Sequence, residues 1–348
     1  MATAPATVTD VAMKAGVSRS SAYQILAAPD HPSYSPATRR RVLQASKELC
    51  YVPHAAARAL RTRQTNTICM FAGEKQFSQG QTGGFAADLL PGLYTAASRL
   101  GYHVLIELEC PAEPERNLNL YRELINSGRI DGLIITGPQK DDPRLEIVGS
   151  SRIPFVAIGR PDPNNQCDSV GSDSISAARL AAQHLLDLGH RRIAHLTGPA
   201  SRHVFEDRRR GYHEAMAAAR AKPTDLVGYD EGFIPKRPAE ELVEELWSSP
   251  QPPTAVMADD DVLAAGVMHA LQKRGLAVPG DVSVVGMNDN MICQRTRPEL
   301  TTVRLNVRRL GEEAARLLIS RIKNPAQPVR PRVVVPGELV VRESSRRL

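Results

Sequence analysis

From Thr65 onward, short apolar runs alternate with amphipathic helical segments. This alternation is typical of an α/β architecture, in which helices cover the faces of a parallel sheet. Because the region spans roughly 280 residues, more than one ordinary core, we expect two doubly wound parallel-sheet lobes. The apolar runs are 67–71, 103–108, 132–136, 154–159, 169–171, 192–196, 226–229, 255–258, 282–286 and 333–335, and the helical segments are 85–100, 115–127, 174–188, 206–220, 238–248, 261–274 and 307–323.

The amino-terminal part shows a different pattern, with three helical segments separated by turn residues. Thr9, Ser18 and Ser35 stand just before these segments, and their hydroxyls are suited to accept the backbone N–H groups that a helix start leaves unpaired. Pro36 suits the first position of the third helix. The expected helices are 10–15, 19–26 and 36–49.

Pro53 ends this helical pattern, and the Ala/Arg segment that follows is too short to be a stable helix by itself. These breaks divide the chain into three parts. We expect a small all-α headpiece at 1–52, a hinge at 53–64 and a two-lobed domain at 65–348.

The excess positive charge of the chain lies at its amino-terminal end. The whole chain has a net charge of +6, and residues 1–63 hold nine basic and three acidic side chains, so the remainder is formally neutral. A cluster of Lys and Arg suits a polyanion, because contacts with phosphates release condensed counterions. Charge alone fits a solvated basic face equally well.

The first two helical segments are joined by Ala15-Gly16-Val17, a turn suited to a helix-turn-helix whose second helix enters the DNA major groove. There, Arg can form two hydrogen bonds with guanine, Gln can pair with adenine, and Ser suits either base. The expected base-reading residues are Arg19, Ser20, Tyr23 and Gln24, and the expected contacts with the DNA backbone are Thr9, Ser18, Ser21 and Arg39. An ordinary three-helix domain without DNA contacts is the alternative.

No pattern points to a metal, a cofactor or a catalytic centre. The five cysteines are scattered without a Cys-x-x-Cys pair, and the nine histidines show no metal-ligand spacing. The sequence has no nucleotide-binding glycine loop, nucleophile elbow or zinc-protease motif. An α/β hydrolase or a kinase therefore ranks behind the binding functions.

The beginning of the sequence predicts the compartment. Met-Ala-Thr-Ala-Pro lacks the basic start and apolar run of an export signal, and no stretch reaches the roughly 18 apolar residues of a membrane span. We expect a cytoplasmic protein with no membrane partner and with buried, reduced thiols. A periplasmic-type small-molecule-binding protein without a DNA role is the second hypothesis, and it would require an export signal in place of the helix-turn-helix.

Several motifs in the same order resemble the LacI-type family of lactose and galactose repressors. They are VTDVAMKAGVS (8–18), SPATRRRVLQASKELCYVPHAAARALRT (35–62), ARLAAQHLLDLGHRRIAHLTGP (178–199), the stretch 253–289 that begins PTAVMADDD, LTTVRLNVRRLGEEAARLL (300–318) and PGELVVRES (336–344). Together they cover nearly the whole chain, so the resemblance is more specific than any single motif. It implies a DNA-binding transcription regulator, most often a repressor, that binds a pseudo-palindromic operator as a homodimer.

The resemblance also implies how the hinge acts. In this family the hinge folds into a helix only on DNA, and a leucine wedges into the minor groove at the operator centre, which bends the duplex. The matching residue is Leu60, with Ala57 beside it. The alternative is that Leu60 packs against the two-lobed domain.

The headpiece departs from the family pattern at two positions of its second helix. Gln24 stands where the family commonly has a base-reading Arg, and Ala27 stands where Asn is usual. We therefore expect an operator that differs from the commonest family sequence.

For the two-lobed domain, the resemblance implies an effector site like that of periplasmic sugar-binding proteins, between the lobes and outside the carboxyl ends of the strands. The candidate residues are Phe85, Asp173, Arg208, Phe233, Asp261 and Asp289, with Asn288 as an alternative to Asp289. An Arg with carboxylates and aromatic faces suits a sugar or sugar derivative, and it suits a nucleoside or an acid equally. We expect the effector to change the angle between the lobes and thereby the operator affinity.

Each effector candidate also has a purely structural interpretation. Asp173 and Asp261 stand where they would cap the helices that follow them. Arg208 is the first of three consecutive arginines, which could form a surface charge cluster.

Overall fold

The computed structural model of the chain divides into two compact units, Met1–Thr65 and Asn66–Leu348. The described residues are 6–52, 59, 62, 64–73, 85–110, 112–161, 167–229, 236–326 and 332–348.

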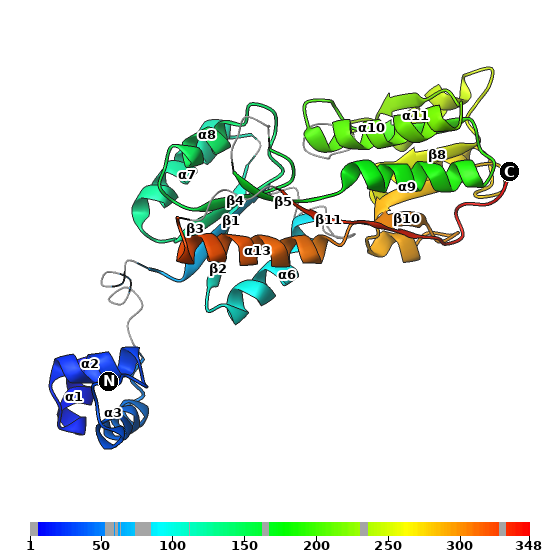
Figure 1. Cartoon of the computed structure of the whole chain (residues 1–348). Helices are drawn as coiled ribbons and strands as arrows, with labels where there is room; N and C mark the ends of the chain where they lie inside the picture. Colours follow the sequence, from blue (N-terminus) through cyan, green and yellow to red (C-terminus); the bar gives the residue numbers. More distant parts are fainter. Residues whose placement is uncertain are drawn as a thin grey trace. The chain divides into compact units, whose positions relative to one another are not determined.

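Residues 6–52 of the first unit form the helices α1 (Val8–Ala15), α2 (Arg19–Ala27) and α3 (Pro36–Glu48) (Figure 1). Gly16 joins α1 to α2 at a φ of 64°, a left-handed conformation that glycine adopts without strain. The predicted caps Ser18 and Ser35 are confirmed, because their Oγ atoms accept the Ser21 and Thr38 backbone N–H groups at 3.0 and 3.2 Å. The small core consists of Val11, Ala12, Ala15, Ala22, Ile25, Val42 and Ala45.

The start of α1 differs from the prediction, because Thr7 and not Thr9 is its cap. Thr7 Oγ1 accepts the backbone N–H of Asp10 at 3.3 Å, and Asp10 Oδ2 accepts the backbone N–H of Thr7 at 2.7 Å. This reciprocal pair satisfies two backbone groups and brings Val8 into the helix against the core. Thr9 is an exposed residue of the first turn.

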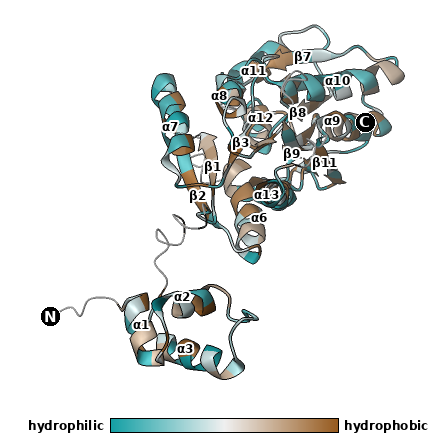
Figure 2. Ribbon diagram, turned by 60° about the vertical axis from the view of Figure 1, so that its left-hand side comes forward, coloured by the Kyte–Doolittle hydropathy of each residue, from teal (hydrophilic) through white to brown (hydrophobic). Residues whose placement is uncertain are grey.

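The first lobe of the larger unit is a six-stranded parallel sheet with the strand order β11-β5-β4-β3-β1-β2. The strands are β1 (Thr67–Gly73), β2 (His103–Glu109), β3 (Gly132–Thr136), β4 (Phe155–Ile158), β5 (Asp168–Ser172) and β11 (Val333–Val335). One face is covered by α6 (Phe85–Arg99) and α13 (Val307–Lys323), and the other by α7 (Pro114–Ser127) and α8 (Pro143–Gly149). Figure 2 shows the polar outer side of α7, whose inner side buries Tyr121 and Leu124.

The second lobe is a six-stranded sheet with the order β12-β10-β9-β8-β6-β7, in which only β12 runs antiparallel to its neighbour. The strands are β6 (Ile193–Thr197), β7 (Thr224–Val227), β8 (Ala255–Ala258), β9 (Ser283–Asn288), β10 (Thr301–Arg304) and β12 (Glu338–Val340). The helices are α9 (Ser174–Asp187), α10 (His203–Ala218), α11 (Ala239–Trp247) and α12 (Asp261–Lys273), with a short 3₁₀ helix at Met291–Gln294. The pairs α9–α10 and α11–α12 pack together (Figure 1).

The chain crosses between the lobes three times, from β5 to α9, from β10 to α13 and from β11 to β12. The crossings are tied to one another. The Asp173 N–H donates to the Val335 carbonyl at 3.1 Å, and Asn306 Nδ2 donates to the Pro336 carbonyl at 3.1 Å. These hydrogen bonds therefore join the three crossing segments into one connection between the lobes.

Helices α6 and α13 pack at very short range through two glycines. A Cβ atom on Gly92 would lie 1.9 Å from the Arg308 carbonyl oxygen, and one on Gly311 would lie 2.3 Å from the Leu89 carbonyl oxygen. Pro91, which interrupts the hydrogen bonds of α6, is exposed. The close contact fixes α13, the helix that follows the second crossing, against the first lobe.

The two-lobed parallel architecture is as predicted, but four described elements are not. The sequence prediction leaves out α8, the 3₁₀ helix Met291–Gln294, β10 and β12, of which β10 is four residues long and β12 only three. The thiols also differ from the expectation: Cys69 and Cys293 are buried, whereas Cys50 is exposed.

Candidate functional site

The exposed side of α2 is the candidate DNA-reading surface. Arg19 and Ser20 are exposed at its start, and Tyr23 and Gln24 are half-buried one turn later. Ser20 and Gln24 are four residues apart and therefore lie on the same side of the helix. The neighbouring backbone-contact candidates are accessible too: Ser18 is exposed, Ser21 is half-buried beside it, and Arg39 is half-buried with one long ion pair of 3.8 Å to Asp30.

Gln24 forms a side-chain hydrogen bond within the headpiece, whereas Arg19 and Ser20 are exposed. The Tyr34 hydroxyl donates a hydrogen bond to Gln24 Oε1. Tyr34 belongs to the loop between α2 and α3, ten residues from Gln24, and no motif in the sequence singles it out. Only the three-dimensional path of the loop brings the two side chains together.

Three of the predicted site residues lie outside the described residues. Ala57 and Leu60 belong to the predicted hinge, and Phe233 belongs to the predicted effector set. The roles assigned to them by resemblance stay predictions.

The carboxyl ends of the two sheets meet through side chains that cross between the lobes. Arg202, at the start of α10, donates from Nη1 to the Gly137 carbonyl after β3 at 3.0 Å. Asp207, on α10, pairs with Arg160 after β4 and lies 3.9 Å from Arg332 before β11. Helix α10 therefore contacts the first lobe at two places.

Arg208 lies on α10 beside Asp207 and is 4% exposed, so the surface-cluster interpretation is wrong. Its Nη1 donates to the Asp259 carbonyl, at the carboxyl end of β8, at 2.6 Å. Its Nε is buried without a hydrogen-bond partner among the described residues, as is the hydroxyl of Tyr229. Tyr229 is 2% exposed and follows β7. Two buried polar groups near the carboxyl ends of β7 and β8 thus have no hydrogen-bond partner among the described residues.

A buried charged cluster lies next to Arg208. His195 on β6 is fully buried between two carboxylates, with Nδ1 2.9 Å from Asp225 and Nε2 3.0 Å from Asp259. Burial alone would lower the pKa of His195, but Asp259 and Asp225 raise it above its usual value. Thr197 Oγ1 donates to Asp259 at 2.6 Å. This cluster holds Asp259, and hence the carbonyl that Arg208 contacts, in one position.

Asp261 lies inside the second lobe and does not cap α12. Its carboxylate is fully buried and accepts hydrogen bonds from Thr302 Oγ1 at 2.6 Å and the Asn290 N–H at 2.9 Å. Burial, with a smaller contribution from Asp260, raises the pKa of Asp261 to about 7. The capping interpretation is wrong, because Asp260 is the cap and accepts the Val262 N–H at 2.7 Å.

Asp289 and its alternative, Asn288, have different surroundings. Asp289 is bound by Arg304 and Arg342, at 2.7 and 2.6 Å. Asn288 Nδ2 donates to Asp260 Oδ2 at 2.8 Å. Asn288 is therefore hydrogen-bonded to Asp260, the cap of α12, whereas the Asp289 carboxylate forms ion pairs with two arginines.

The remaining candidates lie at element starts. Asp173 caps α9, since its Oδ1 accepts the Ser176 N–H at 3.0 Å, so its structural interpretation is confirmed. Phe85 is the first residue of α6, and its side chain is 37% exposed.

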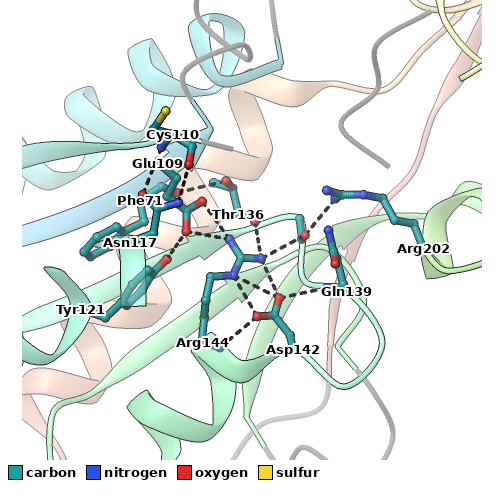
Figure 3. Close-up of polar contacts among 11 residues, drawn as sticks. Phe71, Glu109, Cys110, Asn117, Tyr121, Thr136, Gln139, Asp142, Arg144 and Arg202 are labelled. Atoms are coloured by element: carbon teal, nitrogen blue, oxygen red, sulfur yellow. Dashed lines mark hydrogen bonds and ion pairs between the residues drawn. The ribbon is translucent and has the colours of Figure 1, made fainter. Parts of the chain in front are cut away.

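The first lobe has its own buried ionic network at the carboxyl ends of its strands (Figure 3). Arg144 on α8 donates to Asp142 at 2.6 Å and to Glu109, at the end of β2, at 2.9 Å. Tyr121 donates to Glu109 at 3.0 Å. Arg144 and Arg202 both donate to the Gly137 carbonyl, which links this network to the second lobe.

The described residues contain no group of three or more His, Cys, Asp or Glu side chains arranged to hold a metal ion. None of the described helices is long and apolar enough to span a membrane.

The headpiece and the lobe junction together define the class: a helix-turn-helix regulator joined to a two-lobed binding domain. Residues 182–345 match the family model of a periplasmic binding protein-like domain. Over 341 residues the chain is 33% identical to the HTH-type transcriptional regulator CelR of Thermobifida fusca, with 96% of each protein covered.

Solved structures agree with this class. The CelR–cellobiose complex has a TM-score of 0.71 at 30% identity and covers 97% of this chain and 99% of its own. The lac repressor dimer bound to operator and the anti-inducer ONPF has a TM-score of 0.82 at 25% identity and covers 98% and 99%. The chain belongs to the LacI family, and it is a DNA-binding transcriptional regulator, not an enzyme.

Proposed function

We propose that this regulator represses transcription as a cytoplasmic homodimer on a pseudo-palindromic operator, and that a sugar or sugar derivative bound between its lobes controls operator affinity. Support comes from the regulator CelR of Thermobifida fusca, which is 33% identical. A solved CelR–cellobiose complex, 30% identical, adds support for a sugar as the effector. The lac repressor structure, a dimer on its operator, supports the assembly.

The observation that carries the effector site is the unused donor of Arg208. A buried guanidinium with an unpartnered N–H is costly unless an acceptor reaches it. Nη1 is fixed on the Asp259 carbonyl, so Nε has a defined direction for an incoming oxygen. The buried Tyr229 hydroxyl offers a second unsatisfied group near the same strand ends.

The chemistry of these groups fits a polyhydroxylated ligand. A sugar hydroxyl accepts from an arginine N–H and donates to a carboxylate at the same time. Arg208 and Asp260 supply these two functions and are close enough to interact electrostatically, and Asn288 adds an amide. Phe85 and the predicted Phe233 would supply aromatic faces for the ring.

Helix α10 offers a route from the ligand to the lobe angle. Arg208 follows directly on Asp207, whose carboxylate pairs with Arg160 and Arg332 of the other lobe. A ligand that pulls on Arg208 therefore strains or relaxes these cross-lobe pairs. A change of the angle between the lobes would change the position of the two 53–64 hinges of the proposed dimer. In these hinges, Ala57 and Leu60 are proposed to bind in the DNA minor groove.

On the DNA side, the proposal assigns base contacts and backbone contacts separately. The proposed base contacts are Arg19, Ser20, Tyr23 and Gln24, and the proposed contacts with phosphates are Thr9, Ser18, Ser21 and Arg39.

The test uses the full chain and an operator obtained by selection from random double-stranded DNA. Operator affinity is measured by fluorescence anisotropy with and without sugars, nucleosides and sugar acids, beginning with cellobiose. One compound should change the affinity of the wild type and leave Arg208→Met unaffected. The matched control is Arg210→Met, because Arg210 is exposed and forms an ion pair with Glu214 on its own helix. An equal response of all three proteins would contradict the proposed site.

A further inference from the structure

Gln24 is held in one orientation by a residue outside the recognition helix. The Tyr34 hydroxyl donates to Gln24 Oε1, and both side chains are half-buried. A glutamine amide has one acceptor oxygen and one donor nitrogen. When the oxygen is turned toward Tyr34, the Nε2 hydrogens form the outward edge of the amide.

Tyr34 is itself fixed in place. Its ring packs against the headpiece core, and its backbone N–H donates to the His31 carbonyl at 3.3 Å. The His31 ring lies 5.4 Å from the Tyr34 ring, and the His31 N–H donates to the Ala28 carbonyl at 2.9 Å. The next residue, Ser35, caps α3. Tyr34 therefore stands between an ordered loop and a helix start, and its hydroxyl has little freedom to leave Gln24.

This geometry changes what Gln24 can read. Pairing with adenine requires the amide oxygen to accept from the adenine N6 amino group while Nε2 donates to N7. The Tyr34 hydroxyl takes one of the two lone pairs of this oxygen and turns the oxygen toward the loop, which weakens the second half of that pair. An outward donor matches guanine best, because guanine presents two acceptors, N7 and O6, in the major groove.

We propose that Tyr34 is a positioning residue for DNA recognition, which makes Gln24 a donor-only reader that selects guanine over adenine at its base pair. The proposal concerns the headpiece alone and does not depend on the identity of the effector. It replaces the adenine pairing that the sequence predicts for Gln24.

The experiment measures base preference and not affinity alone. The full chain selects its operator from random double-stranded DNA, and Gln24→Ala then identifies the base pair at which discrimination is lost. Duplexes with each of the four base pairs at this position are titrated against the wild type, Tyr34→Phe and Tyr34→Phe/Gln24→Ala. Tyr51→Phe is the control, because Tyr51 packs against the same core.

The wild type should prefer guanine over adenine, and Tyr34→Phe should shift that ratio toward adenine by roughly five- to tenfold. In the Gln24→Ala background, Tyr34→Phe should leave the ratio unchanged, and Tyr51→Phe should behave like the wild type. A merely structural role of Tyr34 would weaken all four duplexes equally. That result would overturn the proposal, and so would a wild-type preference for adenine or for the amino group of cytosine. The base preference of the wild type can be measured even if a variant fails to fold.

Discussion

The two lobes each carry a buried polar network at the carboxyl ends of their strands, and the networks differ in completeness. In the first lobe, Arg144 donates to Asp142, Glu109 and the Gly137 carbonyl. In the second lobe, Arg208 donates from Nη1 to one carbonyl, and neither its Nε nor the Tyr229 hydroxyl has a hydrogen-bond partner among the described residues. Arg208 is buried and Arg144 is half-buried, but only Arg144 has each of its guanidinium nitrogens hydrogen-bonded within the described part of the chain.

This difference separates a structural network from a binding site. A buried ion network whose members are all satisfied stabilises its surroundings and has nothing to offer a ligand. A network with free donors is destabilising until something fills them. We therefore expect Arg144 to contribute to stability and Arg208 to ligand recognition, a difference that the sequence alone does not show.

The largest expected effect is on stability in the first lobe. Arg144→Met removes the cation that lowers the pKa of Asp142 against the effect of burial, and leaves two carboxylates without a counter-charge. Breaking such a buried pair lowers the free energy of unfolding by about 3–5 kcal/mol. Urea unfolding followed by circular dichroism measures this. Arg122→Met is the control on neighbouring α7, where Arg122 is exposed, and a similar loss in both variants would contradict the assignment.

The second effect is on ligand affinity in the second lobe. Arg208→Met should weaken effector binding by about 2–3 kcal/mol, because a buried charged hydrogen bond is lost, and should lower stability much less than Arg144→Met does. Isothermal titration calorimetry and urea unfolding on the same samples give both quantities. If Arg208→Met bound the effector normally but were as unstable as Arg144→Met, Arg208 would have a structural role and not a binding role.

A third effect concerns the pH dependence of the second lobe. Because the pKa of Asp261 is raised to about 7, the folded state keeps its proton to higher pH than the unfolded state does. Its stabilising contribution is therefore present at low pH and is lost as pH rises from the ordinary carboxyl range toward 7.

Asp261→Asn should remove this dependence. Between about pH 4.5 and pH 7.5, the wild type should lose about 2–3 kcal/mol of unfolding free energy relative to the variant. Urea unfolding of both proteins at several pH values measures the difference. Parallel stability curves would show that Asp261 does not titrate in this range.

The smallest effect is expected at the exposed contact between the lobes. Glu206 lies 3.6 Å from Lys140, and both side chains are at least 40% exposed. Such a pair contributes about 0.5 kcal/mol or less, so Glu206→Gln should change effector affinity by roughly twofold at most. Calorimetry at low and high salt provides the check, and a tenfold change would show that this pair holds the lobes together.

Local rules predict much of the headpiece and most elements of the lobes. Ser18 and Ser35 are readable as caps because the hydroxyl and the helix start are adjacent in sequence. The cap of α1 was harder, since both Thr7 and Thr9 carry a hydroxyl and only the reciprocal bond with Asp10 decides between them. Strand β12 is three residues long and pairs with a distant strand, so periodicity cannot reveal it.

The site residues depend on tertiary packing and were less predictable. Arg208 stands among three consecutive arginines, and only the fold shows that it is buried while Arg210 is exposed. Asp289 and Asn288 are neighbours in sequence, but Arg304 and Arg342 occupy the first and Asp260 contacts the second. Tyr34 could not be found from sequence, because its role depends on the loop that carries it to Gln24.

The most direct test of the central claim is the melting temperature of the full chain and of two variants, Arg208→Met and Arg144→Met, with and without saturating effector. Binding to the folded state at about 100 times the dissociation constant stabilises it by roughly 2.7 kcal/mol. The effector should raise the melting temperature of the wild type and of the destabilised Arg144→Met by similar amounts and should raise that of Arg208→Met much less. An equal rise in Arg208→Met would contradict this prediction.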